Sequence, residues 1–145
     1  MYNEKNYDNP KSSGRSKLTK AFSLLRKEGL LARQNFSCCG TCGGYEISEM
    51  GESKGKKTGK YPAGYVFYHR QDTDTLNRNG VVHLRYGTFE NRNGKLRKGS
   101  FPTLNVGYTI VEAMKTVGLD TEWNGDTGKC ILVNVEGVDM KKESE

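Results

Sequence analysis

Two amphipathic segments, each closed by the dipeptide Gly-Leu, constrain the fold of this chain more than any other feature. Ser16 can cap the first helix, and Pro102 and Thr103 favour the start of the second. Because glycine adopts the left-handed conformation that ends many helices, we expect the helices to end at Gly29 and Gly118. Their apolar residues recur at the spacing of a buried helix face: Leu18, Ala21, Phe22 and Leu25 in the first, and Val106, Ile110, Val111, Met114 and Val117 in the second.

The two Gly-Leu junctions also match each other. When Gly29 is placed on Gly118, Leu30 falls on Leu119, and each pair precedes a segment suited to a strand. An internal duplication would produce this match. So would the general preference of a helix-to-strand junction for a glycine followed by an apolar residue. The sequence alone supports both explanations.

Five segments indicate strands through their β-branched and aromatic residues or through the turns that join them. They are residues 30–36, 65–70, 81–86, 119–124 and 129–135. Residues 45–50 suit a short helix closed by Gly51. Residues 51–64 combine four lysines with four glycines and predict a mobile loop, and residues 72–80 predict a polar connection.

The resulting order, α-β-(α)-β-β-α-β-β, predicts an α+β fold with two main helices packed on one face of a mostly antiparallel sheet. We expect a flexible N-terminal arm at residues 1–15, a single α+β domain at residues 16–135 and a disordered tail at residues 136–145. A content of 34% hydrophobic and 28% charged residues suits one modest core rather than two.

Hydropathy indicates where the protein is located, and its net charge indicates what kind of partner it binds. No segment approaches the roughly 18 consecutive apolar residues of a membrane span, and the first residues lack the basic-then-apolar order of a signal peptide. We therefore expect a cytoplasmic protein with no membrane partner. The net charge of +6 favours a polyanionic partner such as nucleic acid.

The most concentrated chemistry lies in one turn, where Cys38, Cys39 and Cys42 fall within five positions. In a reducing compartment, clustered thiols more often bind metal or do redox work than form disulfides. Two thiolates on a tight turn hold one side of a tetrahedral zinc ion, and the remaining thiol can add a third ligand. The candidates for a fourth ligand come from distant segments: His69, which we favour, His83, Cys130 and Asp72.

The same cysteines are compatible with other uses. A redox C-x-x-C at the start of a helix would have an acidic thiol. A cysteine nucleophile, Cys39 or Cys42, would need His69 as a base and Asp72 to orient the imidazole. Thiols without chemistry, beside a strand histidine and a turn aspartate, fit the sequence equally well.

Three segments each carry four basic residues, and they would form a phosphate-binding surface if the fold brought them to one face. Residues 64–68 also echo the aromatic half of an RNA-recognition strand. Aromatic strands are more often buried and lysine-rich loops are more often only solvated, so nucleic-acid binding stays a hypothesis. The basic residues are Lys11, Arg15, Lys17 and Lys20; Lys54, Lys56, Lys57 and Lys60; and Arg92, Lys95, Arg97 and Lys98.

Two longer motifs carry a family resemblance. They are N-F-x-C-C-x-x-C-G at residues 35–43 and G-Y-x-F-x-H-x-Q-D-T at residues 64–73, supported by residues 24–30 and 118–125. Together they resemble an uncharacterised family of small bacterial domains of unknown function, over most of residues 18–135. The resemblance implies a shared fold and a shared site, and it supplies no mechanism.

The sequence therefore favours a small cytoplasmic binding or regulatory domain without catalytic activity, whose cysteine turn is a structural clasp for zinc. The first alternative is a thiol-dependent enzyme, nucleophilic or redox, that uses His69 and Asp72. The second is a basic accessory protein that binds nucleic acid through its lysine- and arginine-rich loops.

Overall fold

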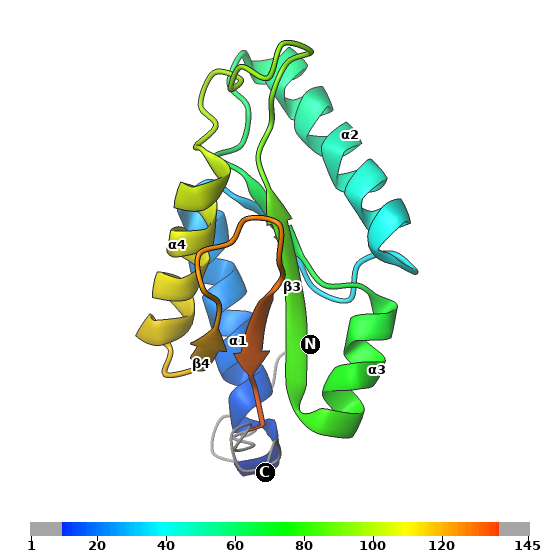
Figure 1. The fold of residues 1–145 in the computed structure, drawn as a ribbon, viewed down its shortest axis with the longest axis vertical. Helices are drawn as coiled ribbons and strands as arrows, with labels where there is room; N and C mark the ends of the chain where they lie inside the picture. The colour runs from blue at the N-terminus through cyan, green and yellow to red at the C-terminus, as the bar shows by residue number, and fades with distance from the viewer. Residues whose placement is uncertain (1–9, 137–145) are drawn as a thin grey trace.

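The computed structural model of the protein describes residues 10–136, in which four helices and five strands alternate as far as α4 and two consecutive strands close the chain (Figure 1). None of these described helices has the length and apolar character needed to cross a membrane. The helices are α1 (Pro10–Lys27), α2 (Gly40–Thr58), α3 (Arg70–Asn79) and α4 (Thr103–Thr116). The strands are β1 (Leu31–Arg33), β2 (Tyr65–Phe67), β3 (Val81–Gly87), β4 (Asp120–Glu122) and β5 (Ile131–Asn134).

The five described strands form one sheet in the order β1-β2-β3-β5-β4. β1 and β2 are parallel, with Ala32 opposite Val66, and the other neighbouring pairs are antiparallel. The expected α+β class with a mostly antiparallel sheet is therefore confirmed. The closing hairpin is confirmed as well, because Thr121 on β4 pairs with Val133 on β5.

The main core lies between the sheet and the two helices that the apolar pattern predicted. Figure 1 shows α1 and α4 together on one side of β3, with α2 and α3 on the other. Phe22 and Leu25 of α1 and Ile110 and Met114 of α4 are fully buried in one cluster with strand residues such as Leu84. Burial of each such side chain contributes about 1.5–3 kcal/mol, so this cluster is the main stabilising feature.

The two Gly-Leu junctions close their helices in the same way. Gly29 and Gly118 have φ angles of 95° and 86°, in the left-handed region that favours glycine. The amide of Leu30 donates to the carbonyl of Leu25 at 3.1 Å, and that of Leu119 donates to the carbonyl of Met114 at 2.9 Å. This bond over five residues defines a Schellman motif, and it places a buried leucine directly after each helix.

Helix α2 corrects the expected short helix at residues 45–50 and most of the expected mobile loop at residues 51–64, because one helix runs through both and ends at Thr58. Gly43, Ile47, Gly51 and Gly55 recur every four residues and form its buried face. A Cβ on Gly43 would lie 2.5 Å from the ring of Phe67, and Gly51 and Gly55 are covered in the same way by Phe89 and Tyr61. The glycines are thus sites of close contact with aromatic rings rather than signs of a loop.

Helix α3 replaces the expected end of the 65–70 strand and the polar connection at 72–80. Its first turn is closed by a capping box between His69 and Asp72, and Gly80 ends it at a φ of 75°. Leu76 is the apolar residue that it buries. The sequence pattern does not indicate this helix, because its apolar stripe is short and histidine is not among the usual capping residues.

The ends of the chain differ from expectation at the first helix. α1 begins at Pro10, so it includes residues 10–15, which we expected in the flexible arm. The side chain of Arg15 pairs with Glu136 at 2.6 Å and joins the start of α1 to the last described residue. Residues 1–9 of the expected arm and residues 137–145 of the expected tail lie outside the described residues.

Candidate metal centre at the start of helix α2

The cysteine turn is fixed to the end of the neighbouring strand by its backbone. Because β1 and β2 are parallel, the segments that follow them leave the sheet at the same edge. The amide of Phe36 donates to the carbonyl of Tyr68 at 2.8 Å, and the amide of Arg70 donates to the carbonyl of Ser37 at 3.1 Å. Asn35 and Ser37 take left-handed φ angles of 49° and 68°, which turn the chain towards α2.

Three free thiols gather where this turn meets the helix. Cys39 is the N-cap residue of α2, in an extended conformation and without a capping hydrogen bond from its side chain. Cys38 and Cys42 are exposed, and the Sγ atoms of Cys38 and Cys39 lie 4.0 Å apart. All three sulfur atoms lie within 4.8 Å of one another. Among the described residues they form the one group of metal-ligand side chains at this spacing.

The surroundings shift the pKa values of Cys39 and Cys42 in opposite directions. The backbone amide of Cys42 and then its thiol favour the Cys39 thiolate, which lowers the pKa of Cys39. The neighbouring thiols of Cys38 and Cys39 raise the pKa of Cys42 to about 11, through hydrogen bonds first and charge repulsion second. Ionisation is therefore favoured at Cys39, at the positive end of the helix, and the Cys42 thiolate forms only against the charge of its neighbours.

This arrangement fits a soft metal ion. With a Zn–S bond of about 2.3 Å, two sulfur ligands of a tetrahedral zinc lie about 3.8 Å apart. The 4.0 Å separation of Cys38 and Cys39 is close to this value, and the 4.8 Å limit for the whole group needs only small side-chain rotations. A divalent cation would also remove the repulsion that opposes the second thiolate. Three sulfur ligands leave one coordination position free for a further group.

His69 lies near the cysteine turn by its backbone, but its ring is engaged elsewhere. The amide of Asp72 donates to His69 Nδ1 at 3.4 Å, and His69 Nε2 lies 3.2 Å from Asp72 Oδ2. Burial of the ring lowers the pKa of His69, although the Asp72 carboxylate partly opposes this. In the described part of the chain, no hydrogen bond joins His69 or Asp72 to a cysteine.

The other candidate ligands lie apart from the three thiols. Cys130 lines a hollow of about 190 Å³ that also reaches Gly40 at the start of α2. His83 lies on β3, paired with Leu132 of β5. Neither belongs to the group of close sulfur atoms. The structure therefore brings together the three local cysteines and leaves the distant candidates in other contacts.

Arg85 is a neighbour of the site that the sequence did not reveal. Its side chain packs so closely on the start of α2 that a Cβ on Gly40 would lie 3.1 Å from Arg85 Nε. The same nitrogen lies 3.8 Å from Asp72 Oδ2. Arg85 thus contacts the first turn of α2 and the capping box of α3. The only available signal was its place on a strand, two residues from His83.

A family comparison agrees with the resemblance carried by the sequence motifs. The model of a family described as "Domain of unknown function (DUF6891)" matches residues 3–138. The chain belongs to the DUF6891 family. Comparison with curated proteins and with solved structures finds no match. Membership confirms the expected uncharacterised family and extends over every described helix and strand of this DUF6891 domain.

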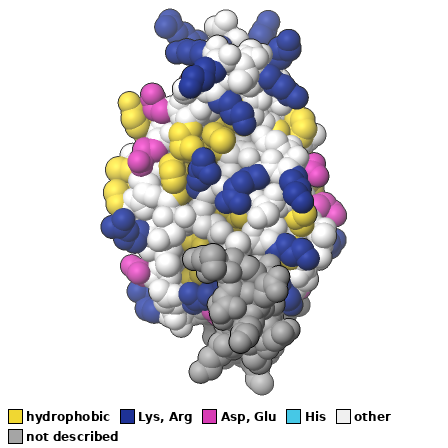
Figure 2. All heavy atoms as spheres, turned by 180° about the vertical axis from the view of Figure 1, so that it is seen from behind, with side chains coloured by type: hydrophobic (Ala, Val, Ile, Leu, Met, Phe, Trp, Pro, Cys, Tyr) yellow, Lys and Arg dark blue, Asp and Glu magenta, His cyan; other side chains and the backbone are white. Residues whose placement is uncertain are grey.

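Two of the three basic segments of the DUF6891 domain meet at one end of the molecule. The amide of Tyr61 donates to the carbonyl of Lys98 at 2.8 Å, and Arg97 pairs with Glu52 of α2 at 3.3 Å. Figure 2 shows lysine and arginine side chains gathered at this end. The third segment, on α1, begins at the opposite end of the molecule (Figure 1). We call the shared end the basic tip: Lys54, Lys56, Lys57, Lys60, Arg92, Lys95, Arg97 and Lys98.

Proposed function

We propose that this DUF6891 domain is a small cytoplasmic binding or regulatory domain without catalytic activity, in which Cys38, Cys39 and Cys42 hold a zinc ion. The observation that carries this proposal is the grouping of three free thiols within 4.8 Å at the start of α2. Free thiols of this kind persist in a reducing compartment, which is the reason for placing the protein in the cytoplasm.

The acidity of the thiols supports a metal over a proton at this site. Zinc requires thiolates, so its binding releases protons and strengthens as the pH rises. Cys39 supplies the first thiolate because its pKa is lowered, whereas Cys42, with a pKa of about 11, ionises readily only when a cation is present. The partial positive charge at the start of α2 favours the negatively charged three-thiolate complex.

The position of His69 supports a role in binding rather than in thiol catalysis. In the proposed site a side chain of another molecule would fill the fourth zinc position and close the tetrahedron. A thiol-dependent enzyme would instead need an imidazole base in contact with the nucleophile. The ring nitrogens of His69 face Asp72 instead, so the enzyme alternative has less support.

Metal analysis under reducing conditions tests the zinc site. Purified protein loaded with zinc and then desalted should retain one ion per chain, and the three thiols should react slowly with a disulfide reagent until a chelator is added. The variant Cys39→Ser should lose at least about tenfold in zinc affinity, because a ligand is removed. The variant Cys130→Ser is the matched control, since Cys130 lies outside the group, and it should retain the ion.

Two outcomes would contradict the zinc proposal. One is a metal-free protein with a single fast-reacting thiol, which would favour the nucleophile. The other is equal zinc binding by Cys39→Ser and the native chain, which would place the metal elsewhere.

The basic tip favours a second candidate function, binding of nucleic acid through phosphate contacts. The eight basic residues of the tip come from two segments, and among the described residues Arg97 is the member that pairs with an acidic side chain, Glu52. Exposed lysines and arginines gathered at one end attract the phosphate backbone without reading sequence. Lysines at the end of α2 also offset the negative end of the helix, which alone would explain some of them.

Salt dependence tests the basic tip. A labelled single-stranded DNA oligonucleotide should bind at low salt, and its affinity should fall steeply as salt rises. Changing Lys54, Lys56 and Lys57 to glutamine should flatten that dependence. The same change at Lys17 and Lys20, in the first part of α1, should have little effect, because α1 begins at the opposite end of the molecule. Binding that ignores salt, or that depends equally on both sets, would reject a phosphate-binding tip.

A further inference from the structure

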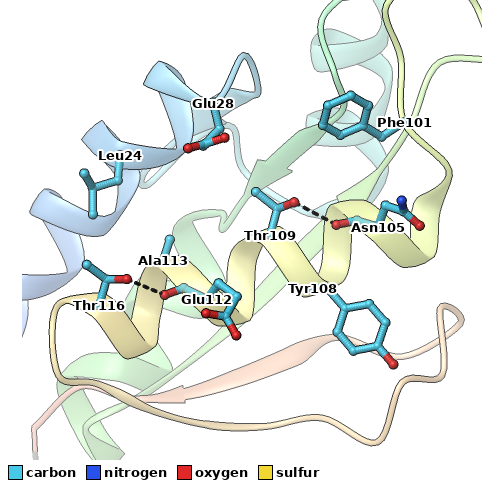
Figure 3. Close-up of a pocket in the computed structure, with 9 residues that line it drawn as sticks. All are labelled: Leu24, Glu28, Phe101, Asn105, Tyr108, Thr109, Glu112, Ala113 and Thr116. Atoms are coloured by element: carbon cyan, nitrogen blue, oxygen red, sulfur yellow. Dashed lines mark hydrogen bonds between the residues drawn. The ribbon is translucent and has the colours of Figure 1, made fainter.

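An open groove of about 630 Å³ runs along helices α1 and α4, and its lining includes none of the three thiols and no residue of the basic tip. One wall is a face of α4 from Asn105 to Thr116, and the other is formed by Leu24 of α1 and by Glu28, which directly follows α1 (Figure 3). Phe101 lies at the end where α4 begins (Figure 3). The groove follows the helices and is lined mostly by carbon.

Two of the four neutral polar side chains that line the groove, Thr109 and Thr116, are satisfied within α4. The hydroxyl of Thr109 donates to the backbone carbonyl of Asn105 at 2.8 Å, and that of Thr116 donates to the carbonyl of Glu112 at 2.8 Å (Figure 3). Because these hydroxyls already have partners, they do not require a polar ligand. The groove therefore presents a mainly apolar surface with two carboxylates.

Exposed apolar side chains gather at one end of the groove. Of the five large hydrophobic residues that are exposed in the described structure, Phe101, Leu104 and Tyr108 belong to α4 or the residues just before it. The ring of Tyr108 packs edge-on against Trp123, with centroids 5.4 Å apart, so it is held in place before any partner arrives. A rigid exposed aromatic ring of this kind is typical of a binding hot spot.

The charge of the groove is opposite to that of the whole protein. Glu28 and Glu112 are its charged lining residues, in a chain with a net charge of +6. Neither carboxylate has an ion pair or hydrogen bond among the described residues. A ligand that placed a positive group beside each of them would gain charge complementarity that the protein itself does not supply.

The length of the groove points to the class of ligand. The positions from Asn105 to Thr116 span about 16 Å at a rise of 1.5 Å per residue, or about three helical turns. We propose that the groove binds a short amphipathic helix of a partner protein, with apolar residues towards Leu24, Ala113 and Tyr108 and with lysine or arginine beside Glu28 and Glu112. This mode, a helix laid into a groove between two helices, would complete a three-helix layer.

A pair of designed peptides tests the groove. The probe is a fluorescent peptide of about 16 residues with leucines at helical spacing and lysines on both flanks, and the matched control peptide carries glutamates in place of the lysines. By fluorescence anisotropy at low salt, the lysine peptide should bind at least about tenfold more tightly than the glutamate peptide.

Variants of the groove separate specific from general attraction. The double change Glu28→Gln and Glu112→Gln should weaken the lysine peptide by about tenfold, and Tyr108→Ala should weaken it by about fivefold or more. Glu122→Gln, an exposed carboxylate on β4 outside the groove, should leave binding unchanged. None of these changes touches the thiols, so the result is independent of the zinc proposal.

Three results would overturn the inference. The first is no binding of the lysine peptide up to about 1 mM. The second is equal binding to the native chain, the groove variants and Glu122→Gln. The third is a dimer of the free protein in sedimentation that Tyr108→Ala dissociates, which would assign the groove to a second copy of the chain.

Discussion

The first turns of α2 and α3 occupy equivalent places in the fold and are built in opposite ways. Each helix follows one of the two parallel strands, so both begin at the same edge of the sheet. α3 begins with a buried capping box in which His69 and Asp72 each bond the other's backbone amide. α2 begins with Cys39, whose side chain makes no capping bond, and with two exposed thiols beside it.

The first turn of α3 stabilises its helix, whereas the first turn of α2 keeps groups that can bind a ligand. In α3 the amides and side chains of the first turn satisfy one another, so little capacity is left for a ligand. In α2 the amides keep their partial positive charge and the thiols keep their ligand atoms. Helix α2 is secured elsewhere, by the contacts of Gly43, Gly51 and Gly55 with aromatic rings. Because these contacts along the helix stabilise α2, its first turn does not need a capping side chain and stays available to a metal ion.

The largest expected effect comes from opening the closed turn. In Asp72→Ala, the buried amide of His69 loses its acceptor at 3.1 Å and Arg85 loses its carboxylate partner at 3.8 Å. The free energy of unfolding in urea should fall by about 2–3 kcal/mol. Asp74→Ala, at an exposed position of the same helix, should change it by no more than about 0.5 kcal/mol. Similar losses in the two variants would show that the capping box does not hold α3.

Two adjacent glycines test how α2 is held. A Cβ at Gly43 would lie 2.5 Å from the Phe67 ring, whereas a Cβ at Gly44 would meet no atom within 4 Å. Gly43→Ala should therefore lower the free energy of unfolding by about 1–2 kcal/mol through overpacking. Gly44→Ala should raise it by about 0.5–1 kcal/mol through helix propensity. Stabilisation by both changes would mean that close seating on Phe67 is not required.

The elements that could be predicted from the sequence are those stabilised by residues close together in the chain. The α1 and α4 helices, their glycine ends and the closing hairpin follow from periodic apolar residues and from turn residues that are close in the chain. Helix α2 was wrongly predicted as a short helix and a loop, because its buried stripe is made of glycines that matter only when Phe67 and Phe89 lie against them. In a sequence, several glycines at such positions are typical of a loop rather than of a helix.

The candidate site shows the same division. The grouping of Cys38, Cys39 and Cys42 was predictable because the three residues share one turn. The place of Arg85 was not predictable, because its contact with Gly40 depends on how β3 and α2 pack together. His69 and Asp72 are three residues apart in the chain, which is the spacing of a capping box. Their contact is therefore predictable from the sequence once histidine is accepted as an N-cap residue.

A smaller change in the free energy of unfolding should follow when the first turn of α2 is given a capping side chain. Cys39 has φ −156° and ψ 174°, the extended conformation of an N-cap residue. In the variant Cys39→Asp, a carboxylate oxygen can accept from the exposed amides of α2, so zinc-free protein should gain about 1 kcal/mol in the free energy of unfolding. Cys38→Asp, one residue outside the cap, should gain less. Equal gains in both would indicate a general charge effect rather than capping.

The smallest expected effect is a pH dependence that belongs to the closed turn. Because burial lowers the pKa of His69 below its ordinary 6.5, the unfolded chain takes up a proton at this ring before the folded chain does. The contribution of His69 to stability is therefore complete above pH 6.5 and is lost as the pH falls through the lowered value. Asp72 limits the size of the effect, because its carboxylate favours the charged ring.

Unfolding in urea from pH 7.5 to pH 5 measures this contribution. His69→Asn keeps a side chain that can accept at the N-cap and removes the titrating ring, so its free energy of unfolding should fall less over this range than that of the native chain. An NMR titration of the His69 ring should follow protonation directly. A midpoint at or above 6.5, or the same pH dependence in both proteins, would contradict burial as the dominant influence on this histidine. A midpoint below 6.5 would show that burial in the closed turn disfavours the charged imidazole, as expected.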